Sequence, residues 1–171
     1  MNTIIIDKKL PKQAKKALTA YGHLIELATE GITYEAISGH PDIFFTQAAG
    51  ELIAAPNLPV LYKDRLTELG VSYLEGEEDV GRKHPDTVRY NAVCTATKLI
   101  HNFRYTDSVI TRLAEDMDLV HVDQGYARCN LLPLDDDHFI TSDRGVFKVL
   151  QGFSADVLLV DPQDIILPGK N

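Results

Sequence analysis

The sequence has little cysteine and no long apolar segment. Its 171 residues include two cysteines, Cys94 and Cys129, too few for a disulfide framework and without the spacing of a zinc knuckle. This usage favours a reducing, cytoplasmic location. The lysines between Lys8 and Lys16 imitate the basic start of a signal peptide, but no apolar run of seven or more residues follows them. Neither secretion nor a membrane span is therefore expected.

Positive charge is also scarce beyond the amino terminus. Lys and Arg together number 17 against 25 Asp and Glu, which gives a net charge of −8. Because several of the lysines lie in the first sixteen residues, the net charge of the remaining chain is still more negative. A surface of this sign repels phosphate groups. We therefore expect neither a nucleic acid nor an anionic membrane as a partner.

Common catalytic and cofactor signatures are missing. The sequence has no phosphate-binding loop, no GxGxxG, no GxSxG and no HExxH, which removes the usual support for nucleotide-binding, serine hydrolase and zinc protease functions. The run Asp135 to Asp137 lacks the spaced oxygen ligands and the glycine of a calcium loop, so we expect a hairpin turn there. No metal and no cofactor is predicted.

What the sequence does contain is an α/β rhythm. Apolar runs of strand length alternate with amphipathic stretches, and the junctions carry Gly, Pro, Asn or Asp. With 44% hydrophobic residues, the chain can bury one sizeable core, so we expect a single domain over residues 1–171. The expected strands cover residues 3–7, 23–28, 42–47, 51–55, 71–74, 88–95, 98–103, 119–123, 129–134, 138–141 and 157–160. One helix is expected after Pro11, and further helices over 62–69, 107–117 and 144–153.

The order of these elements repeats. His40-Pro41-Asp42 returns as His84-Pro85-Asp86, 44 residues later, and each copy precedes the order strand, strand, helix, strand. A third such unit starts near residue 128, and the first 39 residues hold the same unit without its first strand. The predicted ββαβ units are therefore approximately 1–39 (partial), 40–83, 84–127 and 128–171. The alternative is that the tripeptide match is chance and reflects turn chemistry alone.

Three segments carry a family resemblance. Residues 123–130 (DQGYARCN), 139–143 (FITSD) and 166–169 (ILPG) resemble an uncharacterised bacterial family of pentein-like character. Penteins are α/β-propellers whose ββαβ units surround an axis, and they include arginine deiminases, amidinotransferases and dimethylarginine hydrolases. The resemblance implies the same arrangement here. Five units of the observed length would need a longer chain, so the expected fold is an incomplete propeller of about four units.

The resemblance also suggests which chemistry to look for. In pentein enzymes a cysteine thiolate attacks a guanidinium carbon, a histidine transfers protons and carboxylates bind the cationic substrate. Their nucleophile lies near the carboxyl end of the last unit, a position that this sequence does not reach, so Cys129 is not its counterpart. Cys129 is then either a buried structural cysteine or a nucleophile in its own right, with His40 or His84 as base and Asp42 or Asp143 orienting the substrate.

Other polar residues lie near Cys129 in the predicted topology. Gln124, Asp143 and Arg144 occupy strand ends of the third complete unit, where they form either a ligand site together with Cys129 and Asp42 or a solvated rim. Cys94 lies within an apolar strand and is expected in the core.

Two functions follow from these observations. The leading hypothesis is a non-catalytic binding or structural protein for a small polar or cationic ligand. The alternative is a hydrolase or transferase acting on a guanidino or amide compound through a cysteine nucleophile.

The incomplete propeller also makes predictions about assembly and the core. Because it would expose strand edges, we expect either a homodimer through residues 3–7 and 164–168 or a ring closed within one chain. Ile140 and Leu158 are expected in a buried sheet, where an introduced Asp would unfold or strongly destabilise the domain.

Overall fold

The chain alternates short strands and helices, as the sequence predicts. The structure is a computed structural model that describes residues 2–163, so residues 164–168 of the expected dimer interface lie outside the described residues. The strands are β1 (Asn2–Asp7), β2 (Gly22–Leu27), β3 (Phe45–Ala48), β4 (Glu51–Ala54), β5 (Leu74–Glu75), β6 (Val93–Cys94), β7 (Lys98–His101), β8 (Asp118–His121), β9 (Leu131–Pro133), β10 (His138–Thr141) and β11 (Asp156–Leu159). The helices are α1 (Lys12–Leu18), α2 (Pro41–Phe44), α3 (Val60–Glu68), α4 (Ser108–Leu113), α5 (Ala127–Asn130) and α6 (Arg144–Gly152), with one 3-10 turn at Glu35–Ile37.

Three of the four sheets in residues 2–163 share one topology. In β3-β4-β5, β6-β7-β8 and β9-β10-β11, the first two strands pair antiparallel and the third pairs parallel to the second. A helix connects the second and third strands in each case, namely α3, α4 or α6. The remaining sheet holds β1 and β2, which are parallel and joined by α1. The mixed α/β expectation is thus confirmed, and each sheet follows the predicted order of elements.

Local sequence explains several element boundaries. The predicted hairpin between β3 and β4 turns at Ala49 and Gly50, which both have positive φ values of 52° and 82°, the backbone that two-residue hairpin turns require. Asp143 begins α6 as a side-chain cap, since its carboxylate accepts hydrogen bonds from the backbone of Gly145 and Val146. The run Asp135 to Asp137 forms the predicted turn between β9 and β10, where Asp135 accepts from two backbone N–H groups.

The first strands of the units are shorter than expected. The predicted strand over 42–47 begins as helix α2, because Pro41 occupies its first turn. The one over 129–134 begins as helix α5, whose first N–H groups are bound by the side chain of Asn91. The strand expected over 88–95 is confined to β6. In the second and fourth units, a single helical turn therefore directly precedes the first strand.

The two HPD tripeptides occupy different structural positions. His40-Pro41-Asp42 opens α2 directly before β3, whereas His84-Pro85-Asp86 lies in a turn several residues ahead of β6. The strand pairing identifies the repeat more reliably than the tripeptides do, because Ile53, Ile100 and Ile140 occupy the same position in the middle strands of their sheets.

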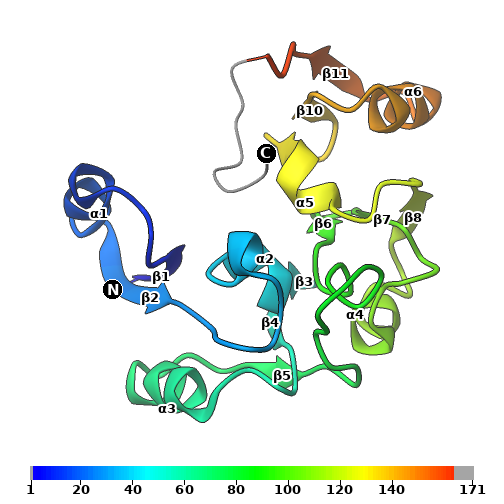
Figure 1. The fold of residues 1–171 in the computed structure, drawn as a ribbon. Coiled ribbons are helices and arrows are strands. Elements are labelled where there is room, and N and C mark those ends of the chain that lie inside the picture. The colour runs from blue at the N-terminus through cyan, green and yellow to red at the C-terminus, as the bar shows by residue number, and fades with distance from the viewer. Residues whose placement is uncertain (1, 164–171) are drawn as a thin grey trace.

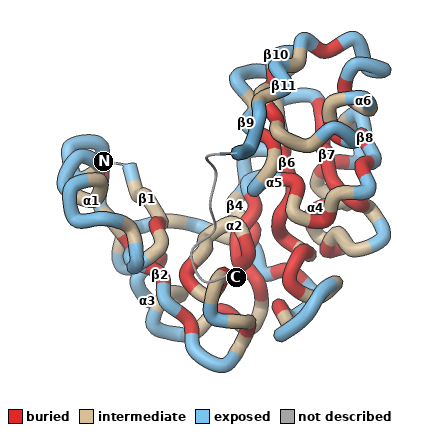
Figure 2. The backbone as a smooth tube through the Cα atoms, turned by 45° about the horizontal axis from the view of Figure 1, so that its top comes forward, coloured by how far each residue is buried: buried red, intermediate tan, exposed pale blue. Residues whose placement is uncertain are grey.

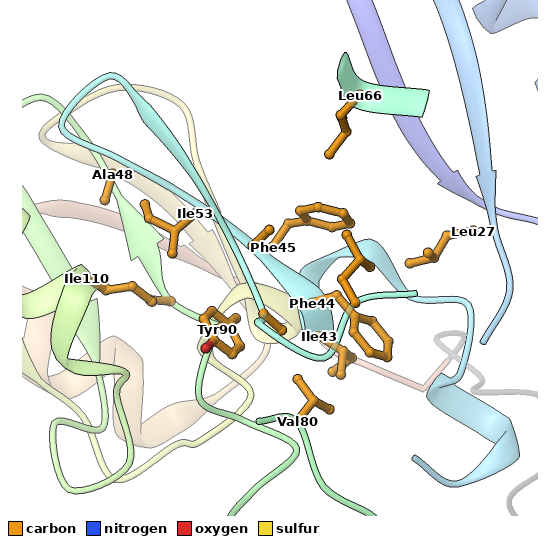
Figure 3. Close-up of a cluster of buried hydrophobic side chains, with 14 of the residues drawn as sticks. Leu27, Ile43, Phe44, Phe45, Ala48, Ile53, Leu66, Val80, Tyr90 and Ile110 are labelled. Carbon is orange, nitrogen blue, oxygen red and sulfur yellow. The ribbon is translucent and has the colours of Figure 1, made fainter. Parts of the chain in front are cut away.

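The helices also connect successive units. Helix α3 contacts β2, α4 contacts β3 and α6 contacts β8, so each packs on the sheet of the preceding unit. The buried residues that share a cluster across these contacts are Ile25 with Leu66, Ile53 with Ile110, and Ile100 with Val146 and Leu150. Figure 3 shows the larger cluster running from Leu27 and Leu66, past Phe44 and Phe45, to Tyr90 and Ile110.

The four sheets follow one another along an arc (Figure 1). The sheet at its carboxyl end, β9-β10-β11, is the least covered. Leu132, Ile140 and Leu158 are paired across its three strands, yet Leu132 is 50% and Leu158 is 58% exposed. The expectation that Leu158 is buried is therefore wrong, because no described helix packs on this face. Among the described residues, no helix has the length and apolarity needed to cross a membrane.

Candidate functional site

A cavity of about 1050 Å³ lies where the units meet. Its walls come from β1, from α2 and β3, from β6, from α5 and β9, and from the end of β10. Because the first strand of each complete unit contributes, residues far apart in the sequence face the same space. A volume of this size suits a small-molecule ligand.

Asp42 and Cys129 meet at the wall of this cavity. The Cys129 Sγ donates a hydrogen bond to Oδ2 of Asp42 at 3.0 Å, although the two residues belong to different units. Both line the cavity, together with His40 and Arg128. Of the sequence-predicted residues, the structure thus brings together Cys129, His40 and Asp42.

Asn91 holds this pair in place and was not foreseen from the sequence. Its side chain is fully buried; the Nδ2 donates to the backbone carbonyl of Asp42 and to Cys129 Sγ, and the Oδ1 accepts from the N–H groups of Arg128 and Cys129. One amide therefore fixes α2 against α5. The sequence does not indicate this role of Asn91, because all of its hydrogen-bond partners are distant along the chain.

The surroundings of Cys129 favour the protonated thiol over the thiolate. Although Cys129 is an exposed residue, partial desolvation of its sulfur at the cavity wall, the negative charge of Asp42 and the hydrogen bond to it raise the pKa of the Cys129 thiol above its ordinary value, and Asn91 and Arg128 lower it by less. Because the thiolate is the nucleophile, this geometry provides a thiol hydrogen-bond donor and a neighbouring carboxylate, not an activated cysteine.

Two tyrosines and a histidine complete the surroundings. The hydroxyl of Tyr34 lies 3.3 Å from that of Tyr126, which is 2.7 Å from Thr87 Oγ1. Burial, Tyr126 and the nearby Cys129 raise the pKa of the Tyr34 hydroxyl, so it stays protonated. The Nε2 of His40 lies 3.7 Å from Oδ2 of Asp7, so this imidazole lies beside a carboxylate of the first unit.

The remaining predicted site residues lie outside the cavity lining. His84 is exposed and packs edge-on against Tyr105. Gln124 donates to the Asp143 carboxylate, and Arg144 is exposed at the start of α6. Although partial burial acts to raise the pKa of Asp143, the hydrogen bonds from Val146, Gln124 and Gly145 outweigh it and hold this pKa below its ordinary value. Asp143 therefore caps α6, and Gln124 holds the Asp143 carboxylate in place.

Within the described residues, neither Cys94 nor a cluster of acidic side chains forms a second candidate site. Cys94 is partly buried against the core, where its Sγ lies 3.7 Å from Met117 Sδ, in keeping with the expectation for this residue. Among residues 2–163, no group of three or more His, Cys, Asp or Glu side chains is arranged to hold a metal ion.

Comparison with known proteins gives one family. The model of a family of unknown function, DUF6873, matches residues 5–171. No curated protein matches the chain.

Proposed function

Since the chain belongs to DUF6873, a family whose function is unknown, its role has to be inferred from the site, and we propose that it is a pentein-like protein that binds a small cationic ligand in its central cavity. In this proposal the protein is not an enzyme and acts in the cytoplasm. The Asp42 carboxylate, hydrogen-bonded to Cys129 in the cavity wall, is the observation that carries it.

The pentein-like arrangement is supported by two features. Three sheets repeat one pattern of antiparallel and parallel pairing, and a cavity is lined by strands from every unit. Units that follow one another around an axis bring equivalent strands to the centre, where side chains of all units converge.

The chemistry of the cavity supports a cation. Asp42 provides a carboxylate that can accept bidentate hydrogen bonds from a guanidinium or amidinium group. Of its oxygen atoms, Oδ2 already accepts the thiol proton, so a ligand N–H group can replace that thiol as donor. Arg128 lines the same cavity and can hold an anionic group at the other end of the ligand.

Calorimetric titration with agmatine and arginine tests this proposal, with citrulline as the uncharged counterpart of arginine. We expect the guanidinium compounds to bind and citrulline to bind far more weakly. Asp42→Asn should weaken binding about tenfold or more, because a hydrogen bond to a charged group contributes about 1.5–3 kcal/mol. Asp64→Asn removes an exposed carboxylate from α3 and should leave the affinity unchanged. Equal affinities for arginine and citrulline would contradict the proposal.

The second candidate function is a cysteine-dependent hydrolase or transferase. It is favoured by the presence of Cys129, His40 and Asp42 in one cavity. The two functions differ in the state of the thiol, because catalysis requires a thiolate and ligand binding does not.

The rate of Cys129 alkylation by iodoacetamide separates the two functions. We expect alkylation at neutral pH to be slower than that of free cysteine, since the pKa of the Cys129 thiol is raised. Asp42→Asn should accelerate alkylation up to about tenfold, which corresponds to about one pKa unit. The labelled peptide is identified by mass, with Asp64→Asn as control. Alkylation of the wild type faster than that of free cysteine, with protection by arginine, would favour the enzyme.

A further inference from the structure

Within the part of the chain that the structure describes, one sheet face is left uncovered at the end of the arc. The outer face of the last sheet, on the side opposite α6, consists of Leu132, Leu134, Ile140 and Leu158; Leu134 is 62% exposed, and Leu132 and Ile140 also line the edge of the cavity. Leu132, Ile140 and Leu158 are paired across three strands, so they form a continuous apolar row. Isolated apolar residues on a surface are ordinary, but a contiguous row indicates an interaction site.

The equivalent row of the preceding unit is fully covered, whereas in β3-β4-β5 the third residue of the row, Leu74, is 40% exposed. In β6-β7-β8 the same positions are Val93, Ile100 and Val120, which are at most 1% exposed, and α6 of the following unit packs there. The chain therefore uses one repeated contact, in which a sheet receives the helix of the next unit. Within residues 2–163, the outer face of the last sheet receives no helix.

At the opposite end of the arc, in the first unit, a helix rather than a sheet face is left exposed. Among the helices that connect parallel strands in the described residues, α1 alone has no buried residue. Figure 2 shows it in pale blue and tan, without red. Helices α3, α4 and α6 each pack on a preceding sheet, whereas no sheet precedes α1 among the described residues.

The charges at the two ends are of opposite sign. Lysines surround and form part of α1, and Lys12 and Lys16 lie one turn apart on it without a salt bridge to any described residue. Beside the outer face of the last sheet, Asp156 is paired with His138 across the strands, and its side chain is 88% exposed. Asp161 follows shortly after β11 and is also exposed.

We propose that the outer face of the last sheet binds the first unit of a second copy of this chain. Helix α1 of one copy then occupies the place that α6 occupies on β6-β7-β8, with Lys12 and Lys16 facing Asp156 and Asp161. The contact is head to tail, and two copies make it reciprocally. Because Leu132 and Ile140 also line the cavity, the partner's α1 covers one edge of it, but the contact itself requires no ligand.

Analytical ultracentrifugation of the chain and two matched variants tests the contact. The wild type is expected at about 38 kDa, twice its mass of 19.0 kDa, at concentrations of tens of micromolar. Leu158→Asp should remain at the mass of one chain with an unchanged circular dichroism spectrum. Leu61→Asp removes a residue that is 72% exposed on α3 and should associate as the wild type does.

Charge-reversal variants test whether α1 and the outer face of the last sheet are the two surfaces in contact. The double variants K12E/K16E and D156K/D161K should each be monomeric, and an equimolar mixture of the two should regain the dimer, because each then meets a partner of opposite charge. K83E/K148E makes the same change in net charge as K12E/K16E, but elsewhere on the surface, and should stay dimeric.

Three results would overturn the proposal. They are a wild type that stays monomeric at hundreds of micromolar, a Leu158→Asp variant that associates as well as Leu61→Asp, and a mixture of the charge variants that remains monomeric.

Discussion

Replacing Asp107 with Ala is expected to lower the free energy of unfolding by about 3–5 kcal/mol. Asp107 is fully buried, and its carboxylate accepts hydrogen bonds from the N–H groups of Glu77, Glu78 and Val109. It also lies 2.9 Å from the Tyr90 hydroxyl. An alanine would leave these donors without their carboxylate partner, and the segment around Glu77 and Glu78 would no longer be held to the start of α4.

Urea unfolding followed by circular dichroism measures this change. Asp116→Ala, an exposed carboxylate after α4, should alter the free energy of unfolding by less than about 0.5 kcal/mol. If Asp107→Ala unfolds at the same urea concentration and with the same slope as Asp116→Ala, the assigned hydrogen bonds do not stabilise the fold.

Acidification is expected to destabilise the protein through His101. Burial lowers the pKa of His101 from 6.5 to about 4, with the carbonyl of Gly125 opposing and His121 adding to the effect. Because the folded pKa is depressed, the unfolded chain binds the extra proton first. This stabilisation is complete above pH 6.5 and is lost as the pH falls to about 4, by about 3 kcal/mol in total.

The comparison that isolates His101 is His101→Gln, which cannot take up the proton. The neutral imidazole donates from Nε2 to the Gly125 carbonyl, and its Nδ1 lies 2.7 Å from Thr106 Oγ1, contacts that a Gln amide can partly replace. The difference in unfolding free energy between wild type and variant should shrink by about 3 kcal/mol between pH 6.5 and pH 4. A difference that is constant over this range would show that His101 does not titrate in this way.

Local patterns predicted most of the elements. Strand β10 has the predicted bounds and α6 ends within a residue of its prediction, because each has a clear apolar period and a turn or cap at its start. Helices α2 and α5 were missed as helices. Each is a single turn, too short for a period, and α5 depends on Asn91, which is remote in sequence.

The candidate site was predictable only in part. His40 and His84 stand in the same tripeptide, yet His40 lines the cavity and His84 does not, since neighbours in sequence do not reveal which strand ends converge. Leu158 reads as a core residue because its strand is apolar throughout. Whether Leu158 is buried depends on whether another unit packs on that face of the sheet. The sequence of one strand does not contain this information.

A crystal structure of the protein with bound agmatine tests the central claim most directly. Asp42 should accept hydrogen bonds from the guanidinium group inside the cavity, and the Cys129 thiol should no longer be its donor. The result that would contradict ligand binding at this site is agmatine bound away from Asp42, or a cavity without agmatine at a concentration that saturates the calorimetric titration.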